Sequence, residues 1–246
     1  MKKGMLALLI ILILGGCSSK AGQETVQQSA QEIIQETVQE TTQQSETLPM
    51  KGVKKGIVET ASAESNAVGG FDAAQLVEIE DVKGGIKVTY HQLPQNQADM
   101  EALVAEYGRE DERRVCAYFH AALVRYPDSA DDCYDMLDVL RGPQPMSASE
   151  KSFMKERFSD KLYLPRTYFE GATPKNEYQP DEPWAIIIYD DPVRPPDGYA
   201  YTMVASGGAD NKRRIVMRIK DGQKYLWEYN GALLSVRLPA SEDPWI

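Results

Sequence analysis

The sequence predicts an α+β protein: a β-hairpin, a block of about four helices, and then an antiparallel β-meander. Between residues 99 and 158, apolar residues recur every three or four positions, which is the period of an amphipathic helix. After Leu162 the period falls to two, as in strands with one buried face. Helices gathered in one stretch and strands in another are typical of the α+β class.

Order is expected to begin near Gly69. β-Branched residues over 74–80 and 86–91 predict two strands, and the glycine pair within residues 81–85 predicts the turn between them. We therefore expect a β-hairpin ahead of the helices.

The helical block is divided by capping signals. The first two helices are expected over residues 99–107 and 111–125. Asp128 or Ser129 can cap the third, which should end at Arg141 before Gly142 and Pro143. Ser147-Ala148-Ser149-Glu150 has the spacing of a capping box, so a fourth helix should start there.

The meander is expected to start with a central strand over residues 184–189, where nearly every side chain is apolar. Prolines then force a loop. Alternating patterns predict strands over 199–205 and 215–219. Asp221-Gly222 predicts a hairpin to a strand over 225–229, and a last strand is expected over 233–238.

The N-terminus has the pattern of a secretory signal peptide: two lysines, an apolar run from Met5 to Leu14, and small residues. The run has about half of the roughly twenty residues that a membrane-spanning helix needs. Leu14-Gly15-Gly16-Cys17 resembles the lipobox of bacterial lipoproteins. This resemblance implies cleavage between Gly16 and Cys17, lipidation of Cys17, and anchoring to the lipid bilayer by its acyl chains. The alternative is an ordinary signal peptide with an accidental cysteine.

These signals divide the chain into three parts. Residues 1–16 are the expected lipoprotein signal peptide. Residues 17–68 are the lipidated cysteine and a linker rich in Gln, Glu, Thr and Ser, expected to be disordered because it has little apolar area. A short surface helix is the alternative there. Residues 69–246 are long enough for a single globular domain.

The charge balance bears on partners. The chain has 27 Lys+Arg and 37 Asp+Glu, a formal net charge of −10. An acidic protein of this kind disfavours nucleic acid and anionic lipid surfaces as partners, although a local basic patch is compatible with it.

Two cysteines remain beside Cys17. An extracytoplasmic location would permit a disulfide between Cys116 and Cys133. In an antiparallel helix pair, however, the partner of Cys133 would lie near residue 123. The offset of Cys116 is then about 10 Å along the helix, which exceeds disulfide reach. We favour two buried free thiols and keep the disulfide as the alternative.

No catalytic or metal motif emerges, so we expect no cofactor, no metal and no assigned catalytic residue. His91 and His120 lack zinc-ligand spacing, and His120 is expected to be a packed or surface side chain. Neither a serine-hydrolase elbow nor a glycine-rich phosphate loop is present. The densest carboxylates, Asp131, Asp135 and Asp138, form either a solvated helix face or a calcium or acid/base site.

Several motifs point to a known family. They are Leu140-Arg141-Gly142-Pro143-Gln144-Pro145, Pro165-Arg166-Thr167-Tyr168-Phe169-Glu170-Gly171-Ala172-Thr173-Pro174, Gly208-Ala209-Asp210, Leu226-Trp227-Glu228 and Glu242-Asp243-Pro244-Trp245. From about Asp99 to its end, the chain resembles the DUF6935 group, an uncharacterised family of bacterial, mainly Firmicute, domains. The resemblance implies no activity.

Two of these motifs combine rigid backbone with aromatic and polar groups, which is common in binding loops. We name Arg141, Gln144, Tyr168 and Phe169 as candidate binding residues; the alternative is that both stretches are structural corners. The sequence thus predicts a membrane-anchored extracytoplasmic lipoprotein that binds an unknown protein or small molecule without catalysis. The alternative is a cell-envelope hydrolase that uses carboxylates of the helical block.

Overall fold

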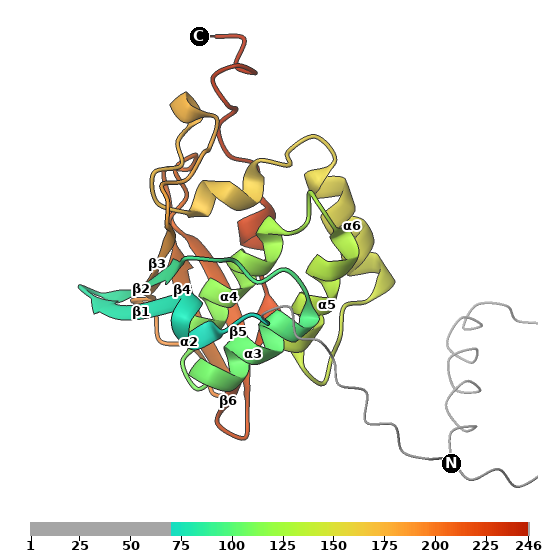
Figure 1. Cartoon of the computed structure of the whole chain (residues 1–246), viewed down its shortest axis with the longest axis vertical. Coiled ribbons are helices and arrows are strands. Elements are labelled where there is room, and N and C mark those ends of the chain that lie inside the picture. Colours follow the sequence, from blue (N-terminus) through green and yellow to red (C-terminus); the bar gives the residue numbers. More distant parts are fainter. Residues whose placement is uncertain (1–69, 246) are drawn as a thin grey trace, which may run out of the picture. The chain divides into compact units, whose positions relative to one another are not determined.

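A computed structural model describes residues 70–245 (Figure 1). The expected signal peptide, the lipid attachment at Cys17 and the linker lie outside these residues. The described part contains one six-stranded antiparallel sheet with the order β1-β2-β3-β4-β5-β6, together with a block of four main helices. The predicted α+β class, with its hairpin, helical block and meander, is therefore confirmed.

The hairpin consists of β1 (Val77–Val82) and β2 (Gly85–Tyr90). Residues 74–76 were expected to begin the first strand, but they belong to a single helical turn, α2 (Ala73–Leu76). The carbonyl of Asp72 accepts hydrogen bonds from the amides of Gln75 and Leu76, which closes this turn. The strand prediction was wrong there because a local hydrogen-bonded turn competes with β pairing.

The helices are α3 (Gln97–Tyr107), α4 (Glu112–Val124), α5 (Ala130–Arg141) and α6 (Ala148–Phe158). Ser129 caps α5, and Ser147 with Glu150 forms the predicted capping box of α6. Helix α3 begins two residues before the predicted start, because the side chain of Asn96 caps it by accepting from the amide of Asp99.

The meander consists of β3 (Trp184–Asp190), β4 (Tyr199–Val204), β5 (Arg213–Lys220) and β6 (Gln223–Glu228). The predicted last strand over 233–238 is absent: residues 230–233 form a short 3-10 helix, η4 (Asn230–Leu233), and the chain then leaves the sheet. The amide of Arg237 bonds to the carbonyl of Gly208, and its carbonyl accepts from the hydroxyl of Tyr178. The backbone amide and carbonyl of Arg237 therefore form hydrogen bonds with loop residues instead of with a neighbouring strand.

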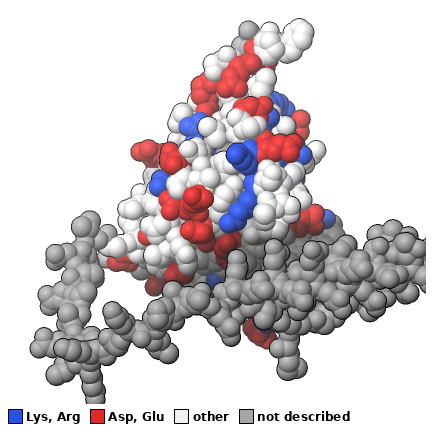
Figure 2. Space-filling view, turned by 90° about the vertical axis from the view of Figure 1, so that its right-hand side faces the viewer, with Lys and Arg blue, Asp and Glu red and all other residues white. Residues whose placement is uncertain are grey.

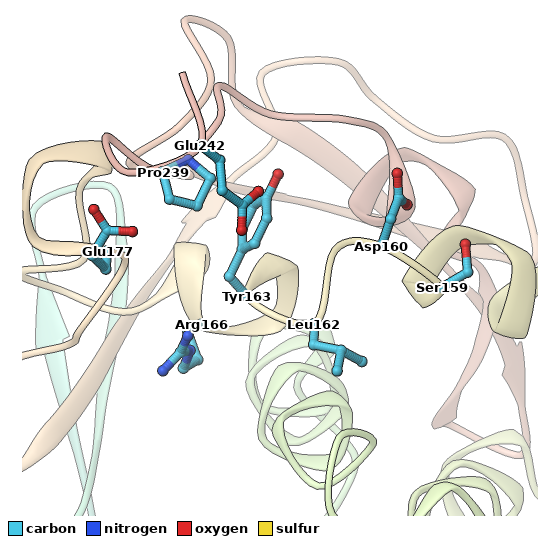
Figure 3. A pocket seen from close by; sticks show the side chains of 8 residues that line it. All are labelled: Ser159, Asp160, Leu162, Tyr163, Arg166, Glu177, Pro239 and Glu242. Carbon is cyan, nitrogen blue, oxygen red and sulfur yellow. The ribbon is translucent and has the colours of Figure 1, made fainter. Parts of the chain in front are cut away.

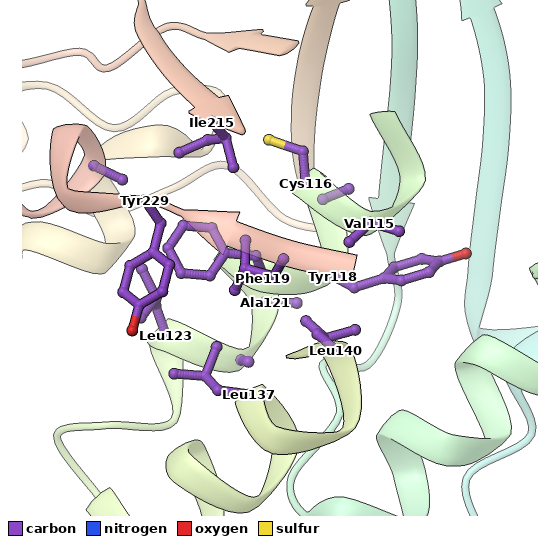
Figure 4. Close-up of a cluster of buried hydrophobic side chains, with 14 of the residues drawn as sticks. Val115, Cys116, Tyr118, Phe119, Ala121, Leu123, Leu137, Leu140, Ile215 and Tyr229 are labelled. Carbon is purple, nitrogen blue, oxygen red and sulfur yellow. The ribbon is translucent and has the colours of Figure 1, made fainter. Parts of the chain in front are cut away.

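Helix α4 is the centre of the core. It packs against β2, β3, β4 and β6, and also against α3 and α5. Every residue from Val115 to Leu123 is buried. Figure 4 shows its side chains between Leu137 and Leu140 of α5 and Ile215 of β5. The sequence pattern predicts only one apolar face, whereas a helix enclosed by a sheet and by other helices is buried all round.

Cys116 and Cys133 are both buried and both free, as favoured from the helix register. None of the helices within residues 70–245 combines the length and the apolar character needed to cross a membrane.

Candidate binding site

Three of the four candidate binding residues from the sequence lie in the interior. Arg141 and Tyr168 are 4 % exposed and Phe169 is 3 % exposed, whereas Gln144 is exposed. Nη2 of Arg141 lies 2.9 Å from a carboxylate oxygen of Glu150, and its Nε donates to the carbonyl of Gln144. These contacts fit the structural-corner alternative, in which the side chains fix the loops from inside.

Tyr168 and Phe169 join the second loop to the core. The hydroxyl of Tyr168 donates to the carbonyl of Ala232 at 2.7 Å. The ring of Phe169 packs edge-on against Tyr90 and Trp184, with centroids 6.4 and 5.2 Å away. Both side chains hold the loop against the sheet and η4.

The carboxylates of the helical block are dispersed. Asp135 and Asp138 line a hollow of about 470 Å³ together with Glu101 and Arg109. Asp138 also accepts a hydrogen bond from the amide of Met146 at 2.7 Å, which fixes the α5–α6 connection. Within residues 70–245 no three His, Cys, Asp or Glu side chains gather closely enough to hold a metal ion.

His120 is packed in the core, in agreement with the sequence analysis. Its Nδ1 lies 2.8 Å from the carbonyl oxygen of Cys116, and its ring lies 4.5 Å from that of Tyr168. Burial lowers the pKa of His120 to about 4, although the hydrogen bond to Cys116 opposes this shift. The imidazole is therefore neutral near pH 7, and it is closed off from solvent.

A candidate site that sequence reasoning missed lies beside a junction of three separate segments. They are η2 (Leu164–Tyr168), residues 206–210, and residues 234–245, here called the C-terminal segment. The amide of Gly207 bonds to the carbonyl of Thr167, and the amide of Ala240 bonds to the carbonyl of Pro174, at 2.8 and 2.9 Å. These contacts build the end of the domain that is uppermost in Figure 1.

The close approach of the segments explains one glycine. A Cβ atom at Gly207 would lie 1.9 Å from the carbonyl oxygen of Ala172, a backbone atom that has little room to move. Glycine is thus the residue that lets residues 206–210 contact the loop after η2. The motifs quoted for the family resemblance overlap these segments, but nothing in their spacing predicts that the segments meet.

Next to η2 and the C-terminal segment lies a hollow of about 370 Å³, here called the Tyr163 hollow; residues 206–210 do not line it. Figure 3 shows the side chains that line it, which are Ser159, Asp160, Leu162, Tyr163, Arg166, Glu177, Pro239 and Glu242. The first residues come from the end of α6 and the corner before η2, and the last from the C-terminal segment.

Tyr163 is the central side chain of the hollow. Its ring stacks on that of Tyr178, with centroids 5.4 Å apart and planes 8° apart. The hydroxyl of Tyr178 donates to the carbonyl of Arg237 at 2.7 Å. Tyr163 is only 6 % exposed, and its hydroxyl is buried. This hydroxyl has no hydrogen-bond partner within residues 70–245. Burial raises the pKa of Tyr163, and the charges of Glu242 and Asp160 add to this shift.

The loop that carries Tyr178 is strained. Glu177 and Tyr178 have φ angles of 56° and 54°, in the left-handed region that residues other than glycine rarely adopt. The carboxylate of Glu177 accepts from the amide and the hydroxyl of Ser241 at 3.0 and 2.6 Å. This contact holds the C-terminal segment as the upper wall of the hollow.

The other charged groups differ in their pairing. Asp160 forms an ion pair with Lys161 at 2.6 Å. Within the described residues, the side chains of Glu242 and Arg166 have no ion-pair partner within 4.0 Å. Figure 2 shows the face on the α6 side, where acidic groups gather toward the upper end and mixed charges cover the middle.

The described residues form a small α+β domain with a hollow of about 370 Å³. The chain belongs to the DUF6935 family, since the family model "Domain of unknown function (DUF6935)" matches residues 92–240, well over half of the chain. No curated protein and no solved structure matches the chain.

Proposed function

We propose that this protein is a non-enzymatic binding module, held on the outer face of the cell membrane by lipid on Cys17, and that it takes a small polar ligand in the Tyr163 hollow. The observation that carries the binding role is the buried hydroxyl of Tyr163, which has no partner among the described residues.

An unpaired buried polar group costs about 1–3 kcal/mol of stability. Tyr178, stacked on Tyr163, satisfies its own hydroxyl at the same place. Strained backbone at Glu177 and Tyr178 costs about 1–3 kcal/mol for each residue and is concentrated at functional sites. A ligand that bonds to the Tyr163 hydroxyl would offset the first of these costs, which favours a binding site over a packing feature.

Membrane anchoring rests on the Leu14-Gly15-Gly16-Cys17 pattern. In cells that process lipoproteins, the Cys17→Ser variant should stay unprocessed or leave the membrane fraction, whereas Ser19→Ala should behave as the wild type. Membrane retention and processing of Cys17→Ser at the wild-type level would contradict the anchoring.

Ligand binding can be tested with thermal unfolding of the full mature protein in the presence of fractionated small molecules from the host envelope. A fraction that raises the midpoint of the wild type should have no effect on Tyr163→Phe. It should still stabilise Tyr189→Phe, because Tyr189 lies on β3, outside the hollow. Equal stabilisation of the wild type and Tyr163→Phe by every active fraction, or no active fraction, would overturn this role.

The alternative is a cell-envelope hydrolase that uses carboxylates of the helical block. It is favoured by the separate hollow that Asp135 and Asp138 line. Under that alternative, Asp135→Asn should abolish turnover of envelope polymers while the free energy of unfolding stays unchanged, and Tyr163→Phe should leave turnover intact.

A further inference from the structure

We infer that the ligand of the Tyr163 hollow carries a protonated amino group, which binds between the carboxylate of Glu242 and the hydroxyl of Tyr163. This inference rests on the proposed binding function and names the chemical class of the ligand.

The lining of the hollow carries more acidic than basic side chains. Three carboxylates line the hollow, from Asp160, Glu177 and Glu242, against one cation, Arg166. Lys161 neutralises Asp160, and Ser241 occupies both carboxylate oxygens of Glu177. Glu242 is therefore the lining carboxylate with no ion-pair or hydrogen-bond partner for its side chain among the described residues.

The hydroxyl of Tyr163 is oriented toward the acidic side of the hollow (Figure 3). In Figure 3 the hydroxyl of Tyr163 points toward the side of the hollow where Glu242 and Asp160 lie, while Arg166 extends from the lower side. A protonated amine has hydrogen-bond donors only, so it can donate to a carboxylate and to a phenolic oxygen together. A carboxylate or phosphate group of a ligand at the same place would be repelled by the negative charge of Glu242.

The size of the hollow and the small number of its polar groups suit an organic ammonium ion. A hollow of about 370 Å³ is at the small end of the range for organic ligands, which is roughly 300–1,000 Å³. A metal ion would need several converging ligands, and within the described residues no such cluster exists. One carboxylate and one hydroxyl suit an ammonium group instead.

The test uses three small molecules of the same chain length: 1,5-diaminopentane, 1,5-pentanediol and glutarate. Each is titrated calorimetrically into the detergent-solubilised full mature protein at low ionic strength. We expect saturable binding of the diamine and none of glutarate. The Glu242→Gln and Tyr163→Phe variants should each weaken diamine binding by about five- to tenfold, the loss of one charge contact or one hydrogen bond in a partly exposed site.

The matched control is Glu80→Gln, which removes the same charge from an exposed position on β1, away from the hollow. It should leave diamine binding unchanged. An equal loss in Glu80→Gln and Glu242→Gln would mean that only the net charge matters and would overturn the inference, as would the absence of diamine binding.

The outcomes separate the inference from the proposed function. If the diol or glutarate binds in place of the diamine, and Tyr163→Phe abolishes this binding, the amino-group assignment is wrong but the hollow is still a binding site. If no molecule binds and no envelope fraction stabilises the wild type, both are wrong.

Discussion

Tyr163 and Tyr178 stack almost in parallel at 5.4 Å, yet only Tyr178 has a bonded hydroxyl. The two phenols share one small apolar cluster with Ala172, and Val236 packs against it. Their hydroxyl groups have opposite consequences: one ties the loop after η3 (Pro174–Asn176) to Arg237 of the C-terminal segment, and the other faces the hollow. Because of this difference, removing each hydroxyl separately distinguishes a binding role from a structural role.

Removing each hydroxyl should therefore have a different effect on stability. Tyr178→Phe loses a hydrogen bond and should lower the free energy of unfolding by about 1 kcal/mol. Tyr163→Phe loses no protein hydrogen bond within the described residues and removes an unpaired buried group, so it should be neutral or stabilising by up to about 1 kcal/mol. Urea unfolding of the two variants measures both values. A larger loss in Tyr163→Phe than in Tyr178→Phe would show that its hydroxyl has a structural partner.

His120 predicts a pH dependence of stability. Its pKa is about 4 in the folded protein, where burial disfavours the charged form, and about 6.5 in the unfolded chain. Between these values the unfolded state binds a proton that the folded state does not. Stability should thus fall as the pH drops from 6.5 to 4, by up to about 3 kcal/mol from this residue.

Carboxylates also lower the stability as the pH falls below about 5. The contribution of His120 is therefore measured by comparing the wild type with His120→Gln, which keeps these carboxylates. Burial works to raise the pKa of Glu150, but its hydrogen bonds with Ser147 and its pairing with Arg141 outweigh burial and leave the pKa lowered. Glu150 therefore loses stabilisation as the pH falls through its folded pKa. Denaturation at pH 7.0 and 5.0 should show a larger loss for the wild type than for His120→Gln. Equal losses would mean that His120 is protonated in the folded state.

The two thiols should be unreactive in the folded protein. Burial raises the pKa of Cys116 to about 12 and that of Cys133 further, so the thiolate that reacts with alkylating agents is suppressed. We expect both cysteines to be labelled only after unfolding, at a rate set by opening of the core. Rapid labelling of the native protein by a maleimide, detected by mass spectrometry, would contradict the burial of both side chains in the core.

Arg141 should matter for stability, in contrast to an exposed arginine. Its side chain is 3 % exposed and forms an ion pair with Glu150, whose side chain is 36 % exposed. Arg141→Met should lower the free energy of unfolding by about 2–3 kcal/mol. This is less than the loss expected when a fully buried ion pair is broken, because the Glu150 side chain stays partly hydrated. Arg237→Met removes an exposed pair with Asp210 and should cost less than about 1 kcal/mol. Similar midpoints for the two variants in guanidinium unfolding would show that the Arg141 pair adds little.

Local signals in the sequence were sufficient for most elements. The caps at Ser129 and Ser147 act through hydrogen bonds within three residues, so the starts of α5 and α6 follow from their immediate neighbours. The prediction over residues 233–238 was wrong because their partners, Gly208 and Tyr178, are distant in the chain and hold them off the sheet.

The candidate site shows the same division. Arg141, Tyr168 and Phe169 have side chains suited to binding, but burial directs them to Glu150, Ala232 and Trp184. Tyr163 and Glu242 carry no recognisable spacing, because 79 residues (242 minus 163) separate them along the chain. Only the fold places both at one hollow.

The sequence by itself determined the α+β class and the succession of hairpin, helical block and meander, and it favoured free thiols at Cys116 and Cys133, because periodicity, capping and helix register are properties of nearby residues. The tertiary structure alone decided that α4 is buried all round, that the chain leaves the sheet after β6, and that Tyr163 faces a hollow closed by the C-terminal segment. These features depend on contacts between residues far apart in the chain, and the energies of such contacts are set by packing and burial rather than by local sequence.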